Sequence, residues 1–175
     1  EKEHEPKHMM YYPIPYEYYE KHGIRRYGFH GTSHRYISKR TTDFLMKKYP
    51  GKYNADTLRV VTCHLGNGSS LAAVKGGKCV DTTMGLTPLE GIMMGTRSGS
   101  IDPAIIPFLM EKEGLTAQEV DTILNKKSGM LGLTSSDPNN EATSDNRTIE
   151  GRAKAGDERA MLVEAMFCHQ LTKLI

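Results

Sequence analysis

The stretch "LRVVTCHLGNGSSLAAVKGGKCVDTTM", residues 58–84, decides the fold of this chain. It contains three short apolar runs rich in β-branched residues, each with the length of a β-strand. The runs are residues 58–65, 69–75 and 78–84. Gly76-Gly77 is a strong two-residue hairpin signal between the second run and the third. The stretch therefore predicts an antiparallel meander of three strands, and its Val-rich first run is typical of a buried strand.

Helices are predicted ahead of this meander. A short helix is expected over residues 16–22, and Gly23 is expected to end it. Thr32 or Ser33 is predicted to cap a longer helix that runs to about Tyr49. The side chains expected on the buried face of this helix are Tyr36, Ile37, Phe44 and Leu45.

Further helices are predicted after the meander. Residues 87–100 contain three glycines and indicate a loop with a short helical turn. Asp102 followed by proline is typical of an N-cap with proline at the first helical position, which predicts a helix over 103–113. Thr116, with Glu119 three residues later, predicts a capping box that opens a helix over 117–126.

The last part of the chain changes character twice. Residues 133–148 are rich in Ser, Asn, Asp and Thr, and predict a long surface loop. An amphipathic helix is expected over 149–175, with a break near Gly156. A strand series followed by helices is an α+β order.

Composition excludes several classes of protein. The chain has 175 residues, 38% of them hydrophobic, and a net charge of +2, which is ordinary globular composition and gives no reason to expect nucleic-acid or membrane binding. No apolar run approaches the length of a membrane span. The three cysteines, Cys63, Cys79 and Cys168, are odd in number and widely spaced, so they do not suggest a disulfide framework. We expect reduced, buried thiols and therefore a cytoplasmic protein.

The two ends suggest a piece of a larger protein. The chain does not begin with Met, and it stops at Ile175 inside an apolar pattern. Residues 1–8 are highly charged, and we expect them to be frayed.

The turn in "HLGNGSS", residues 64–70, is the first candidate for chemistry. Two glycines around Asn67 allow backbone N–H groups to point into one concavity, which suits phosphate oxygens. No Gly-Lys-Ser/Thr follows, so it is not a Walker loop. The alternative is an ordinary hairpin turn, and His64 alone is then a hydrogen-bonded histidine at a strand end.

Arg97 is the second candidate, in "MGTRSGSIDP", residues 94–103. A guanidinium between two glycines, ahead of a capped helix, can bind a carboxylate or a phosphoryl group through two hydrogen bonds. The alternative is a solvated loop arginine, with Asp102 acting as a cap rather than as a metal ligand.

His30 and His34 are the third candidate, in "GFHGTSH". Their spacing of four suggests a metal site on a helix face. If Thr32 or Ser33 caps the helix, however, His30 lies outside it and His34 lies in its first turn, so we expect the two-histidine zinc geometry to fail. A helix N-terminus beside His30 would suit an anion, and the alternative is a structural histidine pair.

Asp145, in "TSDNR", is the fourth candidate. Its carboxylate could accept hydrogen bonds from ribose hydroxyls. The alternative is an Asx-type cap for the final helix.

Together these stretches resemble a known family. The motifs are "RRYGFHGTSHRY", "VTCHLGNGSSLAAVKGGKCVDTTMGLTPLEGIMMGTRSGSIDPAIIPFL" and "LNKKSGMLGL". In this order they are similar to the acetate kinase family, which includes propionate kinases, from about Pro6 to Ile175. The resemblance implies an α+β fold of the actin-like ATPase (ribonuclease H-like) class. Residues 1–22 match poorly, and residues 23–175 would be part of the C-terminal domain.

The resemblance also implies a reaction, the reversible transfer of the γ-phosphoryl group of ATP to acetate, which gives acetyl phosphate and ADP with Mg²⁺ as cofactor. Phosphoryl transfer needs positioning and charge neutralisation more than covalent catalysis. The resemblance further implies a cytoplasmic homodimer, with ATP or ADP and acetate or another short-chain carboxylate as its ligands.

Roles for individual residues follow from matching positions. His30 resembles the histidine that hydrogen-bonds the transferring phosphoryl group, and Arg97 resembles the arginine that stabilises the same transition state. His34 matches a structural histidine. The positions that match nucleotide-contacting segments are His64, Leu65, Gly66, Asn67, Gly68, Asp145, Asn146 and Arg147. Those that match the apolar pocket for the acetate methyl group are Phe29 and Pro88.

Several family features lie outside this sequence. They include the N-terminal domain, with its acetate-binding arginine, and the C-terminal Gly-Gly-x-Gly-Glu-Asn motif and magnesium-binding glutamate. Residues 135–140 resemble an insertion. We therefore expect the isolated chain to be inactive, with its metal ligands elsewhere. The alternative is a catalytically inactive relative that binds nucleotide weakly or acts as a dimerisation or interaction fragment.

Overall fold

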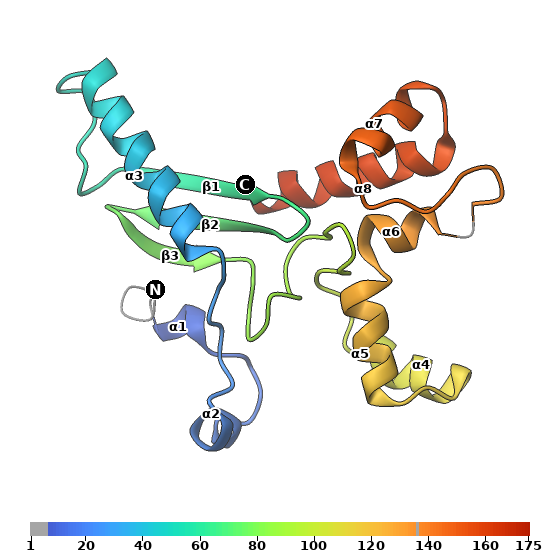
Figure 1. Cartoon of the computed structure of the whole chain (residues 1–175). Coiled ribbons are helices and arrows are strands. Elements are labelled where there is room, and N and C mark those ends of the chain that lie inside the picture. Colours follow the sequence, from blue (N-terminus) through green and yellow to red (C-terminus); the bar gives the residue numbers. More distant parts are fainter. Residues whose placement is uncertain (1–6, 136) are drawn as a thin grey trace. The chain divides into compact units, whose positions relative to one another are not determined.

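The structure is a computed structural model that describes residues 7–135 and 137–175. The chain forms two compact units (Figure 1). The first unit comprises Glu1–Leu65 and Ser70–Glu90, and the second comprises Gly66–Ser69 and Gly91–Ile175. Each unit is described by itself.

The predicted meander is confirmed. Its strands are β1 (Arg59–Leu65), β2 (Ser69–Lys75) and β3 (Lys78–Thr82), in the order β1-β2-β3. The β2–β3 hairpin pairs antiparallel, and its turn residues Gly76 and Gly77 have φ values of 56° and 76°. Two successive positive φ angles are the signature of the type I′ turn that the Gly-Gly pair predicts.

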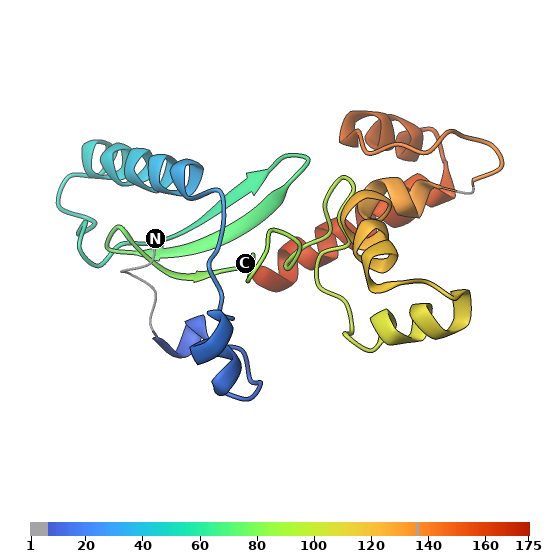
Figure 2. The same ribbon diagram turned by 60° about the horizontal axis from the view of Figure 1, so that its bottom comes forward.

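β1 is not the buried strand that its Val-rich sequence predicts. Val61, Cys63 and Leu65 are exposed, and the exposed fraction of Val61 is 43%. The reason is topological, because β1 is an edge strand and α3 (Gly31–Lys48) covers only one of its faces (Figure 2). The prediction of buried thiols is also wrong, because Cys63 and Cys168 are exposed and Cys79 is half-buried.

The buried face of α3 also differs from the prediction. Tyr36, Ile37 and Phe44 are exposed, with 62% for Tyr36, whereas the buried residues are His34 and Ser38. Apolar periodicity located the helix and its end but identified the wrong face, because the buried contact with the sheet is polar.

The segment ahead of α3 is held by a polar cluster. It carries α1 (Lys7–Met10) and the predicted helix α2 (Glu17–His22), which ends at Gly23 in the left-handed conformation. Arg26 donates to the Thr82 carbonyl and to the Glu90 carboxylate, at 3.0 Å each, and the Tyr12 hydroxyl donates to the same carboxylate. Burial and the Glu90 carboxylate raise the pKa of Tyr12 to about 12.

Residues 1–8 were expected to be frayed. Positions 1–6 lie outside the described residues, whereas Lys7 and His8 begin α1.

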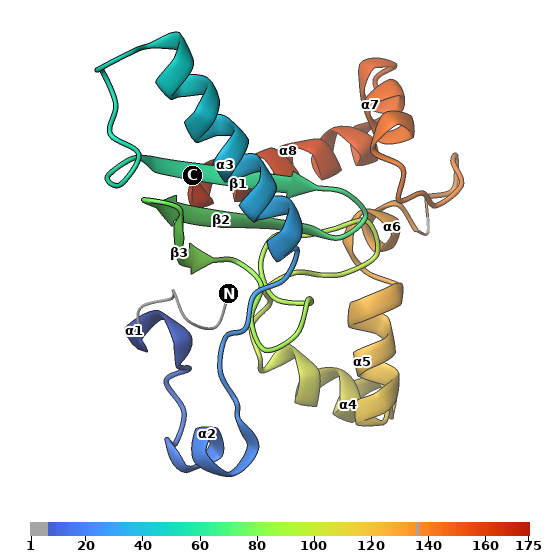
Figure 3. The same cartoon turned by 60° about the vertical axis from the view of Figure 1, so that its left-hand side comes forward.

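The second unit is helical, with α4 next to α5 and α7 next to α8 (Figure 3). Its helices are α4 (Ile105–Glu113), α5 (Ala117–Lys126), α6 (Gly129–Thr134), α7 (Asn146–Lys154) and α8 (Glu158–Leu174). The capping box of α5 is present as predicted, with Thr116 and Glu119 bonded reciprocally. The break near Gly156 is confirmed, and it separates α7 from α8.

The start of α4 and the presence of α6 differ from the prediction. α4 begins at Ile105 rather than at residue 103, and Ala104 is its N-cap, while the Asp102 carboxylate accepts from the Ala104 N–H in a turn ahead of the helix. α6 was not predicted, because it contains two glycines within six residues. The loop between α6 and α7 is consequently shorter than residues 133–148.

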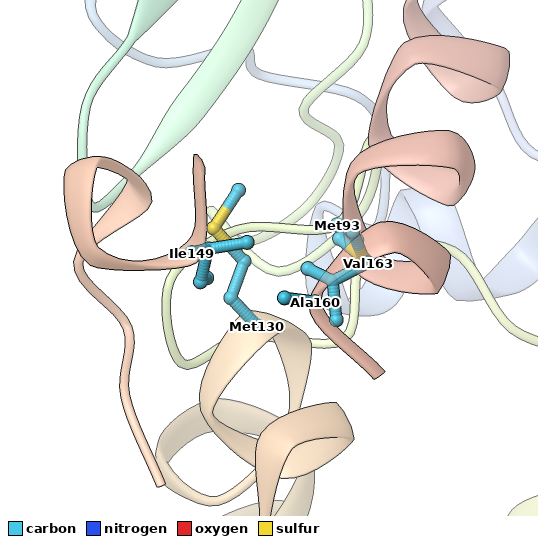
Figure 4. Close-up of a cluster of buried hydrophobic side chains, with 5 residues drawn as sticks. All are labelled: Met93, Met130, Ile149, Ala160 and Val163. Carbon is cyan, nitrogen blue, oxygen red and sulfur yellow. The ribbon is translucent and has the colours of Figure 1, made fainter. Parts of the chain in front are cut away.

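The core of the second unit gathers residues from four parts of the chain (Figure 4). Its members are Met93, Met130, Ile149, Ala160 and Val163. Among the described residues, no helix combines the length and the apolar composition needed to cross a bilayer.

A cavity test checks this core. Ile149→Ala should lower the free energy of unfolding by about 2–5 kcal/mol, because the side chain is fully buried and its loss leaves a void. Leu162→Ala on α8 removes the same number of carbon atoms from a side chain that is 49% exposed, and should cost much less. Denaturant unfolding measures both, and equal losses would contradict the assigned core.

Candidate functional site

Three imidazoles gather at the start of α3 in the first unit. His30 Nδ1 and His34 Nε2 each lie 2.8 Å from the hydroxyl of Ser70, on β2. His64, on β1, lies with its Nδ1 2.9 Å from the Ser33 hydroxyl. The rings of His30 and His64 stack, with centroids 4.0 Å apart and planes inclined by 19°. The site is therefore assembled from a helix N-terminus and two strands.

His30 has an unusual backbone conformation. It is the N-cap of α3 with φ 61° and ψ 23°, and within the described residues it is the one non-glycine residue with positive φ. The left-handed conformation costs a non-glycine residue roughly 1–2 kcal/mol, so the contacts of His30 must hold it there. Neither Thr32 nor Ser33 caps the helix, which corrects the predicted N-terminus.

The predicted separation of the two histidines is only partly right. As predicted, His30 lies outside the helix and His34 lies in its first turn. What the prediction did not include is that one nitrogen of each ring lies within hydrogen-bond distance of the same hydroxyl. Across residues 7–135 and 137–175, no group of three or more His, Cys, Asp or Glu side chains is arranged to hold a metal ion. Both converging nitrogens are engaged by a serine.

His34 is buried and bonded on both sides. Its Nδ1 lies 2.8 Å from the hydroxyl of Thr62, and its Nε2 bonds Ser70. Burial, reinforced by the neighbouring His30 and His64, lowers the pKa of His34 to about 4. The ring is therefore neutral at pH 7, and one of its nitrogens must accept.

Phe29 lines an apolar pocket of about 100 Å³ beneath the start of α3. The opposite wall is formed by the β2–β3 hairpin, with Ala72, Val74 and Cys79. Pro88 is not among the lining residues, so the structure does not bring the two predicted pocket residues together there.

The glycine turn between β1 and β2 belongs to the second unit. Its Gly66 N–H donates to the Gly68 carbonyl, and the Asn67 carbonyl accepts from the Gly95 N–H at 3.1 Å. A Cβ at Gly95 would lie 2.1 Å from Asn67 Oδ1, so a side chain at this position would displace the Asn67 amide. The turn is exposed at Gly66 and Asn67.

The loop that carries Arg97 is held by backbone hydrogen bonds. The Arg97 carbonyl accepts from Met94 N–H at 3.0 Å, and the N–H groups of Met130 and Leu131, at the start of α6, donate to the Met94 and Gly95 carbonyls. The first amides of α6 are thus used to fix the loop. The half-buried Arg97 side chain has its Nη1 3.6 Å from the sulfur of Met94.

Asp145 caps α7, as its cap interpretation predicts. Its carboxylate accepts from the Arg147 N–H, and the Arg147 guanidinium bonds it through Nε at 3.1 Å and Nη2 at 2.8 Å. These hydrogen bonds lower the pKa of Asp145 to about 2. Asn146, the first residue of α7, is exposed. The ribose role of this segment stays a prediction.

The predicted site residues divide between the two units. Those in the first unit are Phe29, His30, His64, Leu65 and Pro88, and those in the second are Gly66, Asn67, Gly68, Arg97, Asp145, Asn146 and Arg147. Sequence reasoning missed Ser33, Thr62 and Ser70. The sequence did contain a signal for Thr62. It lies two residues before His64 on β1, so the two side chains point to the same face of the strand.

Comparison with known proteins identifies the family. A sequence model described as "Acetokinase family" matches residues 3–175. The chain belongs to the acetokinase family. It is 55% identical over 170 residues to an acetate kinase of Treponema denticola, and 56% identical over 171 residues to one of Thermoanaerobacter pseudethanolicus. Each alignment covers 97% of this chain and 40% of the relative.

Solved acetokinase structures share the fold. An acetate kinase of Porphyromonas gingivalis superposes with a TM-score of 0.86 at 47% identity, and covers 97% of this chain and 39% of its own. A propionate kinase of Francisella tularensis gives 0.85 at 41% identity, with 97% and 40% covered. The predicted actin-like ATPase class is therefore confirmed. The chain spans about two-fifths of the length of these acetokinases, and its division at residue 22 stays a prediction.

Two glycines with similar backbone angles test how the Arg97 loop is held. A Cβ at Gly129, φ 60°, would lie 2.1 Å from the Met94 carbonyl oxygen, whereas at Gly114, φ 67°, it would meet nothing within 4 Å. Gly114→Ala should cost about 1–2 kcal/mol from backbone strain alone. Gly129→Ala should lower the unfolding free energy clearly more, as measured by thermal unfolding. Equal losses for the two variants would show that the loop moves away from the new Cβ at no cost.

The low pKa of His34 makes stability depend on pH. Because His34 stays neutral in the folded chain down to about pH 4 while an unfolded histidine takes up a proton near pH 6.5, this stabilisation is complete above pH 6.5 and is lost as the pH falls toward 4. His34→Gln removes this contribution, so the difference in unfolding free energy between the two proteins should shrink over that window. A difference that does not change with pH would contradict the assignment.

Proposed function

We propose that this chain is a segment of an acetate kinase, and that its residues serve reversible phosphoryl transfer between ATP and acetate in the longer protein. The observation that carries the proposal is its 55% identity, over 97% of its length, to a protein named acetate kinase. The accompanying expectations are a cytoplasmic homodimer and a short-chain carboxylate as acceptor.

The proposed role of the first unit is to present His30 to the transferring phosphoryl group. Its ring is held by the Ser70 hydroxyl and by the stack on His64, so little reorganisation is needed when charge develops. Phe29, which lines an apolar pocket, is proposed to contact the acceptor methyl group together with Pro88.

The proposed role of the second unit is to bind nucleotide and to stabilise charge. The Gly66-Asn67-Gly68 turn would contact phosphates, Arg97 would stabilise the same phosphoryl group, and the segment around Asp145 would lie at the ribose. The support is the fixed backbone of the Arg97 loop and the exposed turn, since both orient polar groups without further ordering.

Mg²⁺ is proposed to accompany the nucleotide, because phosphate oxygens supply much of its coordination. The proposed protein ligands of the ion lie outside this segment.

A nucleotide titration tests the proposal. Adding ATP with Mg²⁺ should shift the backbone amide resonances of Asn67, Gly95 and Arg97, and Gly68→Val should weaken the effect at least several-fold, because a branched side chain obstructs the turn. Gly151→Val on α7, where a Cβ meets nothing within 4 Å, is the matched control.

Two results would count against the proposal. If no resonance shifts at millimolar nucleotide, the chain does not bind nucleotide and the interaction-fragment alternative is left. Sedimentation would then test whether the chain self-associates. Sustained acetyl phosphate formation by the isolated chain, measured as hydroxamate, would contradict the expectation that the segment needs the rest of the protein.

A further inference from the structure

The Ser70 hydroxyl is placed between two imidazoles and is completely buried, with 0% of the residue exposed. It lies 2.8 Å from His30 Nδ1 and 2.8 Å from His34 Nε2. A serine hydroxyl has one proton to donate, so it can donate to one ring and must accept from the other. The direction of these bonds decides which nitrogen of His30 carries a proton.

The direction is set at the far end of the chain of hydrogen bonds. The Thr62 hydroxyl donates to the Ala72 carbonyl at 3.3 Å, and a carbonyl can only accept. Having used its proton, Thr62 must accept from His34 Nδ1–H, and His34 Nε2 must then accept from Ser70.

The reverse direction satisfies fewer of these contacts. If Thr62 donated to His34 instead, its contact with the Ala72 carbonyl would contain no proton. Only the direction from His30 toward Ala72 gives every contact a donor and an acceptor. The neutral state of His34, which the order requires, agrees with its lowered pKa.

For His30 the consequence is that Nδ1 always donates. The proton on Nδ1 bonds Ser70, so in the neutral ring Nε2 carries a lone pair, and Nε2 carries a proton only in the imidazolium. A lone pair repels a phosphoryl oxygen, whereas an imidazolium N–H donates to it. The stack on His64 fixes the plane of the ring as well.

We propose that Ser70 is a positioning residue for His30, and that with His34 and Thr62 it keeps a proton on His30 Nδ1, so that His30 can donate to the phosphoryl group through Nε2 only as an imidazolium. This inference rests on the proposed function for the role of His30, but the proton order itself does not.

Histidine ¹⁵N resonances test the proton order directly. In the wild-type chain we expect the neutral Nδ1–H form of His34 and a protonated Nδ1 on His30. Thr62→Val keeps the shape of a buried side chain but removes the acceptor of His34 Nδ1–H. The order should then reverse, with Ser70 donating to His30, so that the Nδ1 resonance of His30 moves to the unprotonated range.

Ser70→Ala is the second variant, and should release the His30 ring so that its neutral form gains the Nε2–H tautomer. Ser38→Ala is the matched control, because Ser38 is a buried serine of α3 whose hydroxyl donates to the Arg35 carbonyl within the helix. It should leave all three histidine spectra unchanged.

Two results overturn the inference: an unprotonated His30 Nδ1 in the wild-type chain, or a His30 spectrum that Thr62→Val does not change. The proposed function fails with a different pattern, in which Thr62→Val reverses the proton order but ATP with Mg²⁺ never shifts the His30 resonances of the wild-type chain.

Discussion

The polar contact between α3 and the sheet is the constraint on which the first unit depends. Helices usually pack on sheets through an apolar stripe, but here the buried residues of α3 are His34 and Ser38, and His34 bonds the hydroxyls of Thr62 and Ser70 on the sheet. Such an interface is stable only if each polar group has a partner, and every buried side-chain nitrogen or oxygen in the described residues has one. The hydrogen bonds therefore fix the position of the helix as well as the orientation of its rings.

The second unit fixes its loop by a different means. Gly129 allows the Met94 and Arg97 carbonyls to approach more closely than a side chain would permit, and Gly95 leaves room for the Asn67 side chain. The first amides of α6 bond the carbonyls of the loop. A short helix with two glycines has little stability of its own. It is stabilised because its N-terminus completes the loop and Met130 joins the core.

Local rules predicted local structure well. The Gly-Gly hairpin, the capping box of Thr116 and Glu119, and the break at Gly156 all depend on a few neighbouring residues, and all three are present. Burial was predicted poorly, since it depends on what covers a face. Val61 and Tyr36 have the spacing expected of buried residues, but both are exposed. In the first unit, the covered faces of β1 and α3 are the ones opposite to these side chains.

The spacing of His30 and His34 shows why the arrangement of the site could not be predicted from the sequence alone. A spacing of four suggests two side chains on one helix face, and the cap argument suggested two side chains apart. Neither considers an N-cap in the left-handed conformation, which places His30 outside the helix while its ring still reaches the hydroxyl that His34 reaches from within. The hydroxyl comes from Ser70, forty residues from His30, and no local pattern links it to the pair. A long-range contact therefore determines the chemistry of a short motif.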